Sequence, residues 1–205
     1  MTRPHEDLQH HTAVDHRPGG PPVQFPVHRW CAIDVVHVKS DRIQAGLSAY
    51  ETLIEQARTS AVKAGAAAIL RSADDRRVFA LVEVAGHDAF AHLQSAWDDH
   101  HLQAEHRTVA ESSALALYQV VSATGDCALD PRSKDAYACE QISLAPREAV
   151  AILEALKTEQ GFRGALLFAT DDATKSFTLY RFEHAAQIAG PRPAAQAVHP
   201  VKTFA

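Results

Sequence analysis

Residues 87–107 read HDAFAHLQSAWDDHHLQAEHR and follow an apolar run, VFALVEV, at residues 78–84. The stretch holds five of the thirteen histidines and one of the two tryptophans. At the 3.6-residue spacing of a helix, one face carries Phe90, Leu93, Trp97 and His101. We therefore predict an amphipathic helix that packs this face against a sheet, so that titratable and aromatic groups line one apolar surface.

Short apolar runs surround this helix. Residues 31–38, CAIDVVHV, are typical of a strand covered on both faces. An apolar stripe at helical spacing follows, made of Ile43, Leu47, Tyr50, Ile54, Ala57 and Ala61. Residues 66–72 and 77–84 then predict a hairpin, and residues 114–121, ALALYQVV, predict a fourth strand. The resulting order βαββαβ is the ferredoxin-like motif.

The same order begins again after a polar segment. YACEQISL starts at residue 137, a helix can start at Pro146, and FRGALLFA and SFTLYRF predict a second hairpin. The Asp74-Asp75 turn recurs as Asp171-Asp172, which indicates an internal duplication. The second copy lacks a long histidine-rich helix, because Gly190 and Pro191 would end any helix there early. A final strand is expected near residues 198–203.

Two such units predict an α+β fold in which two ferredoxin-like βαββαβ repeats pack sheet on sheet as a dimeric α+β barrel within one chain. We expect a flexible N-terminal arm, because its start is rich in His, Pro and Gly and poor in large apolar side chains. The predicted segments are the arm (1–28), the first repeat with the main site (29–121), a linker (122–135) and a second, degenerate repeat (136–205).

Composition excludes several classes of function. A formal charge of −5 with scattered Arg and Lys argues against nucleic acid as a partner. The longest apolar runs fall short of the roughly 18 residues that span a bilayer, and the N-terminus lacks the apolar core of a secretion signal, so we expect a cytoplasmic protein. The three cysteines form no CxxC pair, and the N-terminal histidines match no metal-site spacing, so we expect no metal site.

Two short motifs in the histidine-rich helix carry a family resemblance. HLQS at residues 92–95 and HLQA at residues 101–104 resemble the His-Leu-x-Ser and His-x-Gln-Ala segments of the antibiotic biosynthesis monooxygenase family of dimeric α+β barrels. The duplicated layout is most similar to the angucycline ring-opening oxygenases of aromatic polyketide biosynthesis. The resemblance implies an oxygenase with a polycyclic aromatic polyketide substrate and O2 as co-substrate. It also implies either reduced flavin (FADH2 or FMNH2), with a flavin reductase as partner, or no cofactor. A homodimer is a further candidate assembly.

The expected chemistry is deprotonation of a phenolic substrate, because the anion can pass an electron to dioxygen. A histidine suits this step near neutral pH. His101 is the first candidate base because it shares the buried face with Trp97, and His92 is the second. Trp97 would supply a flat wall and one N–H donor, and Leu93 and Phe90 would complete the apolar lining.

Three further polar residues are candidates for substrate binding. Asp34 and His37 lie inside the first strand, where unpaired polar groups are costly. Their odd separation puts them on opposite faces, so at most one of them lines a given cavity. Arg71 could stabilise an enolate or a flavin phosphate, or could be an exposed strand end. We expect one principal site, within residues 31–121.

Other functions fit the same pattern. A cofactor-free anthrone monooxygenase, a polyketide cyclase or a haem-degrading oxygenase could use the same scaffold. A non-catalytic ligand-binding protein would be favoured if the histidines are exposed and the cavity is small. Fold alone does not decide among these functions, because function resides in the site. The sequence has no GxGxxG motif and no P-loop, so a flavin would be held by the pocket itself.

Overall fold

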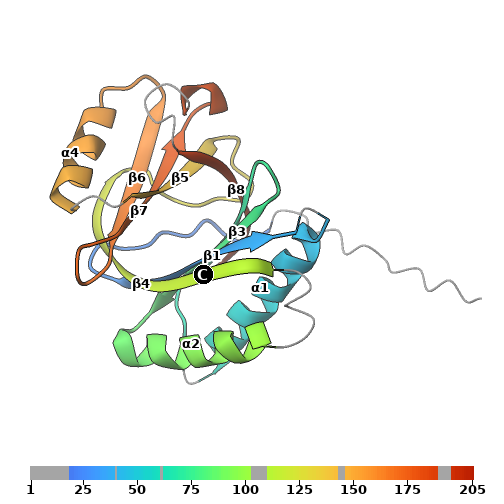
Figure 1. The fold of residues 1–205 in the computed structure, drawn as a ribbon. Coiled ribbons are helices and arrows are strands. Elements are labelled where there is room, and N and C mark those ends of the chain that lie inside the picture. Colours follow the sequence, from blue (N-terminus) through green and yellow to red (C-terminus); the bar gives the residue numbers. More distant parts are fainter. Residues whose placement is uncertain (1–18, 40, 61, 103–109, 143–145, 189–194) are drawn as a thin grey trace, which may run out of the picture.

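The computed structural model describes residues 19–39, 41–60, 62–102, 110–142, 146–188 and 195–205, whose arrangement Figure 1 shows. These described residues form eight strands, three α-helices and one short 3-10 helix. The α+β architecture predicted from the sequence is therefore confirmed. The internal duplication stays a prediction.

The elements follow one another in two similar series. The first half comprises β1 (Trp30–Val38), α1 (Ile43–Thr59), β2 (Ala67–Ser72), β3 (Arg77–Val84), α2 (His87–Leu102) and β4 (Ala110–Gly125). The second half comprises β5 (Ala136–Ile142), α4 (Pro146–Leu156), β6 (Phe162–Ala169), β7 (Ser176–Phe182), the 3-10 helix η1 (Ala185–Gln187) and β8 (Gln196–Phe204).

The strands close into a barrel in the order β1-β3-β2-β8-β5-β7-β6-β4. Antiparallel pairing of β2 with β8 and of β4 with β6 joins the two halves. Helices α1 and α2 lie together outside the barrel against the first half, and α4 lies outside against the second half (Figure 1). The helices therefore cover the outer faces of the strands, and the inner faces pack against each other.

Strand β1 shows why the sequence folds in this way. Its residues alternate between two apolar clusters, because successive side chains of a strand point to opposite faces. Cys31 and Ile33 belong to the cluster inside the barrel. Ala32 and Val36 belong to the cluster beneath α1 and α2. Both faces of β1 are buried, which explains the unbroken apolar run at residues 31–38.

Some element boundaries differ from the sequence-based expectation. Strand β4 reaches Gly125 and takes up the start of the predicted 122–135 linker, because residues from Gln119 to Gly125 pair with β6 of the other half. Helix α2 spans His87–Leu102 of the described part, and residues 103–107 of the predicted helix lie outside it. Strand β8 forms where a last strand was expected.

The predicted N-terminal arm extends too far at its C-terminal end. From residue 19 onward the chain packs on the barrel: Gly19 bridges to Lys202, and Val23 bridges to Leu129. Val23 and Phe25 are buried in the barrel cluster. These two apolar side chains close one part of the barrel, which explains why the segment is not free. Residues 1–18 lie outside the described part.

None of the described helices combines the length and the apolar character that crossing a bilayer requires.

Candidate functional site

A buried carboxylate lies at the centre of the outer face of the first half. Asp34 on β1 is fully buried beneath α1 and α2. Its Oδ2 accepts hydrogen bonds from the Tyr50 hydroxyl at 2.5 Å and from Trp97 Nε1 at 2.9 Å. Its Oδ1 accepts from the Ser113 hydroxyl at 2.9 Å and from the backbone N–H of Ala114 at 3.1 Å. Four donors from three different elements thus converge on one side chain.

The local sequence explains this convergence. Asp34 points outward from β1 because it has the same parity as Ala32 and Val36. Tyr50 lies on the buried stripe of α1, and Trp97 lies on the buried face of α2. Residues Ser113 and Ala114 belong to β4, which pairs with β1 at this level. The carboxylate therefore ties both helices to two neighbouring strands.

The electrostatics of the cluster favour a protonated phenol. Burial, followed by the negative charge and the hydrogen bond of Asp34, raises the pKa of Tyr50 well above its ordinary value. Tyr50 therefore stays neutral near pH 7 and acts as the donor to Asp34. Its ring also lies near the indole of Trp97, with centroids 5.9 Å apart. The arrangement holds Trp97 in one orientation through both its N–H group and its ring.

A groove lies beside this cluster, between α1 and α2. Its volume is about 240 Å³, and its described lining is Leu53, Gln56, Ala57, Ser60, Val62, Leu93, Ala96 and Trp97. Trp97 therefore borders the groove while its N–H group binds Asp34. The volume lies just below the roughly 300–1,000 Å³ of common ligand pockets. Leu53, Leu93 and Trp97 form its floor and are each at most 3% exposed.

The structure brings some of the predicted site residues together. Leu93 and Trp97 border the groove, Phe90 packs against the same apolar cluster, and Asp34 binds Trp97 directly. His101 lies in the last turn of α2, one helical turn after Trp97. The side chain of His101 lies outside the described part, so its role as base stays a prediction.

Three other predicted residues lie apart from the cluster. His92 is exposed on α2, where its Nδ1 lies 2.8 Å from the carbonyl oxygen of Asp88. His37 lies on the face of β1 opposite to Asp34, as its odd separation predicted. Arg71 forms an ion pair with Asp75 at 3.2 Å, near the end of β2.

Sequence reasoning missed two members of the cluster. Tyr50 was assigned only to the apolar stripe of its helix, and Ser113 fell just before the predicted strand at residues 114–121. A signal for Tyr50 existed in the sequence. An aspartate inside an apolar strand requires a buried donor, and Tyr50 has the only hydroxyl group on the stripe that faces this strand.

The groove and its surroundings offer little to a metal or a flavin. Within the described part, no group of three or more His, Cys, Asp or Glu side chains could hold a metal ion. The described lining of the groove contains no charged side chain that could bind a flavin phosphate. The groove is also smaller than common cofactor sites. The groove as described does not fit a flavin.

No protein-family model matches the chain, and no curated protein matches its sequence. Solved structures do match its fold. An anthrone oxidase-like protein has a TM-score of 0.64 at 10% identity, over 90% of this chain and 96% of that one. A protein named as a monooxygenase from Fusobacterium nucleatum has a TM-score of 0.54 at 13% identity, over 87% and 95% of the two chains.

A third match is a variant of the chlorite dismutase from Candidatus Nitrospira defluvii, with a TM-score of 0.52 at 11% identity. It covers 86% of this chain and 93% of the other. Identities this low establish the fold alone. The chain thus has a fold similar to that of these three proteins, and its strands close into a barrel.

Proposed function

We propose that the protein is an oxygenase of antibiotic biosynthesis that acts on a polycyclic phenolic polyketide of the anthrone or angucycline type, with O2 as co-substrate. The observation that carries the proposal is the buried Asp34 carboxylate, which fixes Trp97 at the edge of a groove between two helices. The likeness in fold to an anthrone oxidase-like protein supports the same class. The small volume of the groove favours a tricyclic anthrone over a larger angucycline.

The roles of the residues follow from their positions. His101, one turn after Trp97 on α2, is the proposed base that removes the acidic proton of the bound substrate. Trp97 and Leu93 form the buried floor of the groove, at 1% and 0% exposed, and the ring system is proposed to lie over them between exposed Gln56 and Ala96. Asp34 and Tyr50 are positioning residues, because they hold Trp97 and the two helices in place. A buried carboxylate with several donors keeps such a site rigid.

The proposed reaction balances with O2 alone. Deprotonation of the anthrone CH2 group gives an anion, which transfers an electron to O2. A C–O bond then forms between the resulting radical pair. Loss of water leaves a carbonyl group, so that CH2 and O2 become C=O and H2O. Ring cleavage of an angucycline would need a reduced flavin as an additional reductant, and flavin is therefore an arm of the test.

The two halves are proposed to be duplicated repeats with unequal roles. Helix α2 covers Asp34 in the first half, whereas the second half has the three-residue η1 between β7 and β8. We therefore place the principal site in the first half and give the second half a structural role. Association into a homodimer and a cytoplasmic location remain parts of the proposal, whereas a flavin reductase would be a partner only in the flavin-dependent alternative.

The test is O2 consumption by the purified protein with a panel of anthrones and angucyclines, each with and without reduced flavin. O2 uptake with anthrones in the absence of reduced flavin supports the proposal. The variant His101→Ala should lower the rate about 100-fold or more. His199→Ala is the matched control, because His199 is exposed on β8, and it should keep the rate.

The remaining outcomes separate the alternatives. A rate that falls in His92→Ala and not in His101→Ala would move the base to His92. Uptake only with reduced flavin would select the ring-opening reaction. A coloured protein with a haem absorption band would select haem chemistry. Absence of uptake in every condition would overturn the proposal in favour of a cyclase or a binding protein.

A further inference from the structure

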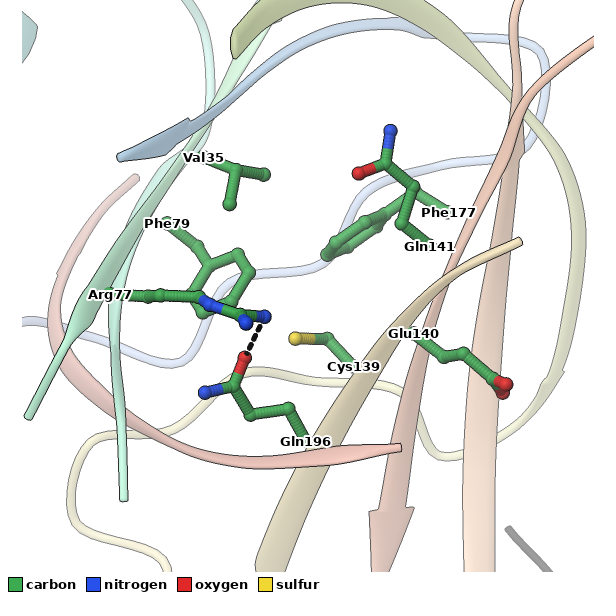
Figure 2. Close-up of a pocket in the computed structure, with 8 residues that line it drawn as sticks. All are labelled: Val35, Arg77, Phe79, Cys139, Glu140, Gln141, Phe177 and Gln196. Carbon is green, nitrogen blue, oxygen red and sulfur yellow. Dashed lines mark hydrogen bonds between the residues drawn. The ribbon is translucent and has the colours of Figure 1, made fainter. Parts of the chain in front are cut away.

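A second cavity lies inside the barrel, apart from the groove between α1 and α2. It has a volume of about 400 Å³, which falls within the roughly 300–1,000 Å³ of common ligand pockets. Figure 2 shows its lining, which comes from both halves of the chain: Val35, Arg77, Phe79, Cys139, Glu140, Gln141, Phe177 and Gln196. The cavity therefore exists only because the two halves close on each other.

A guanidinium group reaches into this cavity. Arg77 extends from the start of β3 toward the centre of the space (Figure 2). Its Nη1 donates to Gln196 Oε1 at 2.7 Å. The amide of Gln196 in turn donates through Nε2 to Asp74 Oδ1 at 3.3 Å. A neutral amide thus holds the guanidinium in place.

A described carboxylate that acts on Arg77 is Asp74, which interacts with its charge at a distance and is linked to it through Gln196. In the part of the chain that the structure describes, no carboxylate forms an ion pair with Arg77. Glu140 lines the cavity, but its carboxylate points away from Arg77 (Figure 2). The Glu140 carboxylate accepts a hydrogen bond from the Tyr180 hydroxyl at 3.2 Å. A half-buried guanidinium with free donors favours an anionic partner.

The walls around Arg77 are apolar and aromatic. Phe79 of β3 and Phe177 of β7 come from the two halves, with ring centroids 6.3 Å apart and planes inclined by 46°. Both rings are buried. Cys139 belongs to the same lining, and burial raises the pKa of its thiol far above the ordinary value, so the thiol is neutral. The cavity combines one cation with a flat apolar lining.

We propose that this cavity is a second ligand site, which binds a small aromatic carboxylate. The carboxylate pairs with the guanidinium of Arg77, since a planar guanidinium binds a carboxylate through two parallel hydrogen bonds. The aromatic ring packs against Phe79 and Phe177. This site is separate from the groove between α1 and α2, and the proposal does not depend on the oxygenase function.

The first experiment is calorimetric titration of the full chain with acetate, benzoate and 1-naphthoate, and with the neutral 1-naphthamide. Affinity should rise from acetate to 1-naphthoate, because the larger ring buries more apolar surface. 1-Naphthamide should bind about 10-fold or more weakly than 1-naphthoate, because it lacks the charge. Equal affinity for acetate and 1-naphthoate would overturn the aromatic part of the proposal.

Variants then test the position of the site. Arg77→Gln should weaken 1-naphthoate binding about 10-fold or more, whereas Arg76→Gln should change it less than about 2-fold. Arg76 is the matched control because it is the adjacent arginine and is exposed. Val35→Phe fills the cavity from β1 and should abolish 1-naphthoate binding. This second variant keeps the test valid if Arg77→Gln does not fold.

Two results would overturn the proposal. The first is a dissociation constant of wild-type protein for 1-naphthoate above about 10 mM. The second is equal affinity of the Arg77→Gln and Arg76→Gln variants, which would place any binding elsewhere. Because the readout is heat of binding without O2, loss of the oxygenase proposal would leave these results unchanged.

Discussion

The two halves place a carboxylate at the same register position and surround it differently. Asp34 of β1 lies opposite Ala80 of β3, and Glu140 of β5 lies opposite Thr178 of β7. Asp34 is 0% exposed and Glu140 is 8% exposed. Each accepts a hydrogen bond from a tyrosine, at 2.5 Å in the first half and at 3.2 Å in the second.

The cover over each carboxylate explains the difference. The sixteen-residue α2 lays Trp97 over Asp34, and the Trp97 N–H group is one of its donors. In the second half, the segment between β7 and β8 contains the three-residue η1. Glu140 is also among the residues that line the cavity inside the barrel. In the first half the long helix α2 thus supplies a donor to the carboxylate, whereas in the described part of the second half Tyr180 of β7 supplies one.

The largest expected effect is that of Asp34→Asn. The new NH2 group would replace an oxygen that accepts from Tyr50 and Trp97, so two buried donors would lose their acceptor. We expect the free energy of unfolding to fall by about 3–5 kcal/mol. Urea unfolding followed by tryptophan fluorescence measures this change.

Glu140→Gln is the matched variant in the second half. Because the Tyr180 hydroxyl can still donate to the amide oxygen, the loss should be smaller than that of Asp34→Asn. Equal losses in the two variants would contradict the difference between the halves.

The sequence contains much of this arrangement, although not all of it. The run CAIDVVHV predicted a strand buried on both faces, and the spacing of Leu93 and Trp97 predicted the buried face of α2. Tyr50 was overlooked as a partner of Asp34, because a stripe pattern treats it as apolar, although a buried aspartate requires a donor. The inner cavity could not be predicted, since Arg77 and Gln196 lie 119 residues apart and meet only when the barrel closes.

The next largest effect is the loss of unfolding free energy on removing the hydroxyl of either tyrosine. Tyr50→Phe removes a hydrogen bond to a buried carboxylate and should lower the free energy of unfolding by about 1.5–3 kcal/mol. Tyr180→Phe removes the longer bond to Glu140 and should cost about 1 kcal/mol. The same urea experiment serves both variants. A larger loss for Tyr180→Phe would reverse the ranking of the two carboxylate sites.

The pH dependence of the free energy of unfolding tests the contribution of Tyr50 separately. Its pKa in the folded protein is raised, so its stabilising contribution is complete below pH 10 or so and is lost as pH rises above that value. The unfolded chain then releases the tyrosine proton while the folded chain retains it. Above about pH 10, the wild-type protein should therefore lose stability more steeply than Tyr50→Phe, by up to about 1.4 kcal/mol per pH unit. Parallel curves for the two proteins would show that Tyr50 ionises equally in both states.

The smallest effect concerns the two thiols on the inner faces of the halves. Burial raises the pKa of both Cys31 and Cys139 far above the ordinary value, so neither should be a thiolate at pH 8. Cys139 borders the inner cavity, whereas Cys31 is enclosed within the barrel core. Methyl methanethiosulfonate should therefore modify the half-buried Cys127 first, then Cys139, and Cys31 only when the whole chain unfolds.

Peptide mapping by mass spectrometry over time gives the three rates. If Cys31 and Cys139 reacted at one rate under native conditions, the cavity would not reach Cys139 from solvent, and the inner faces of the two halves would be equally closed.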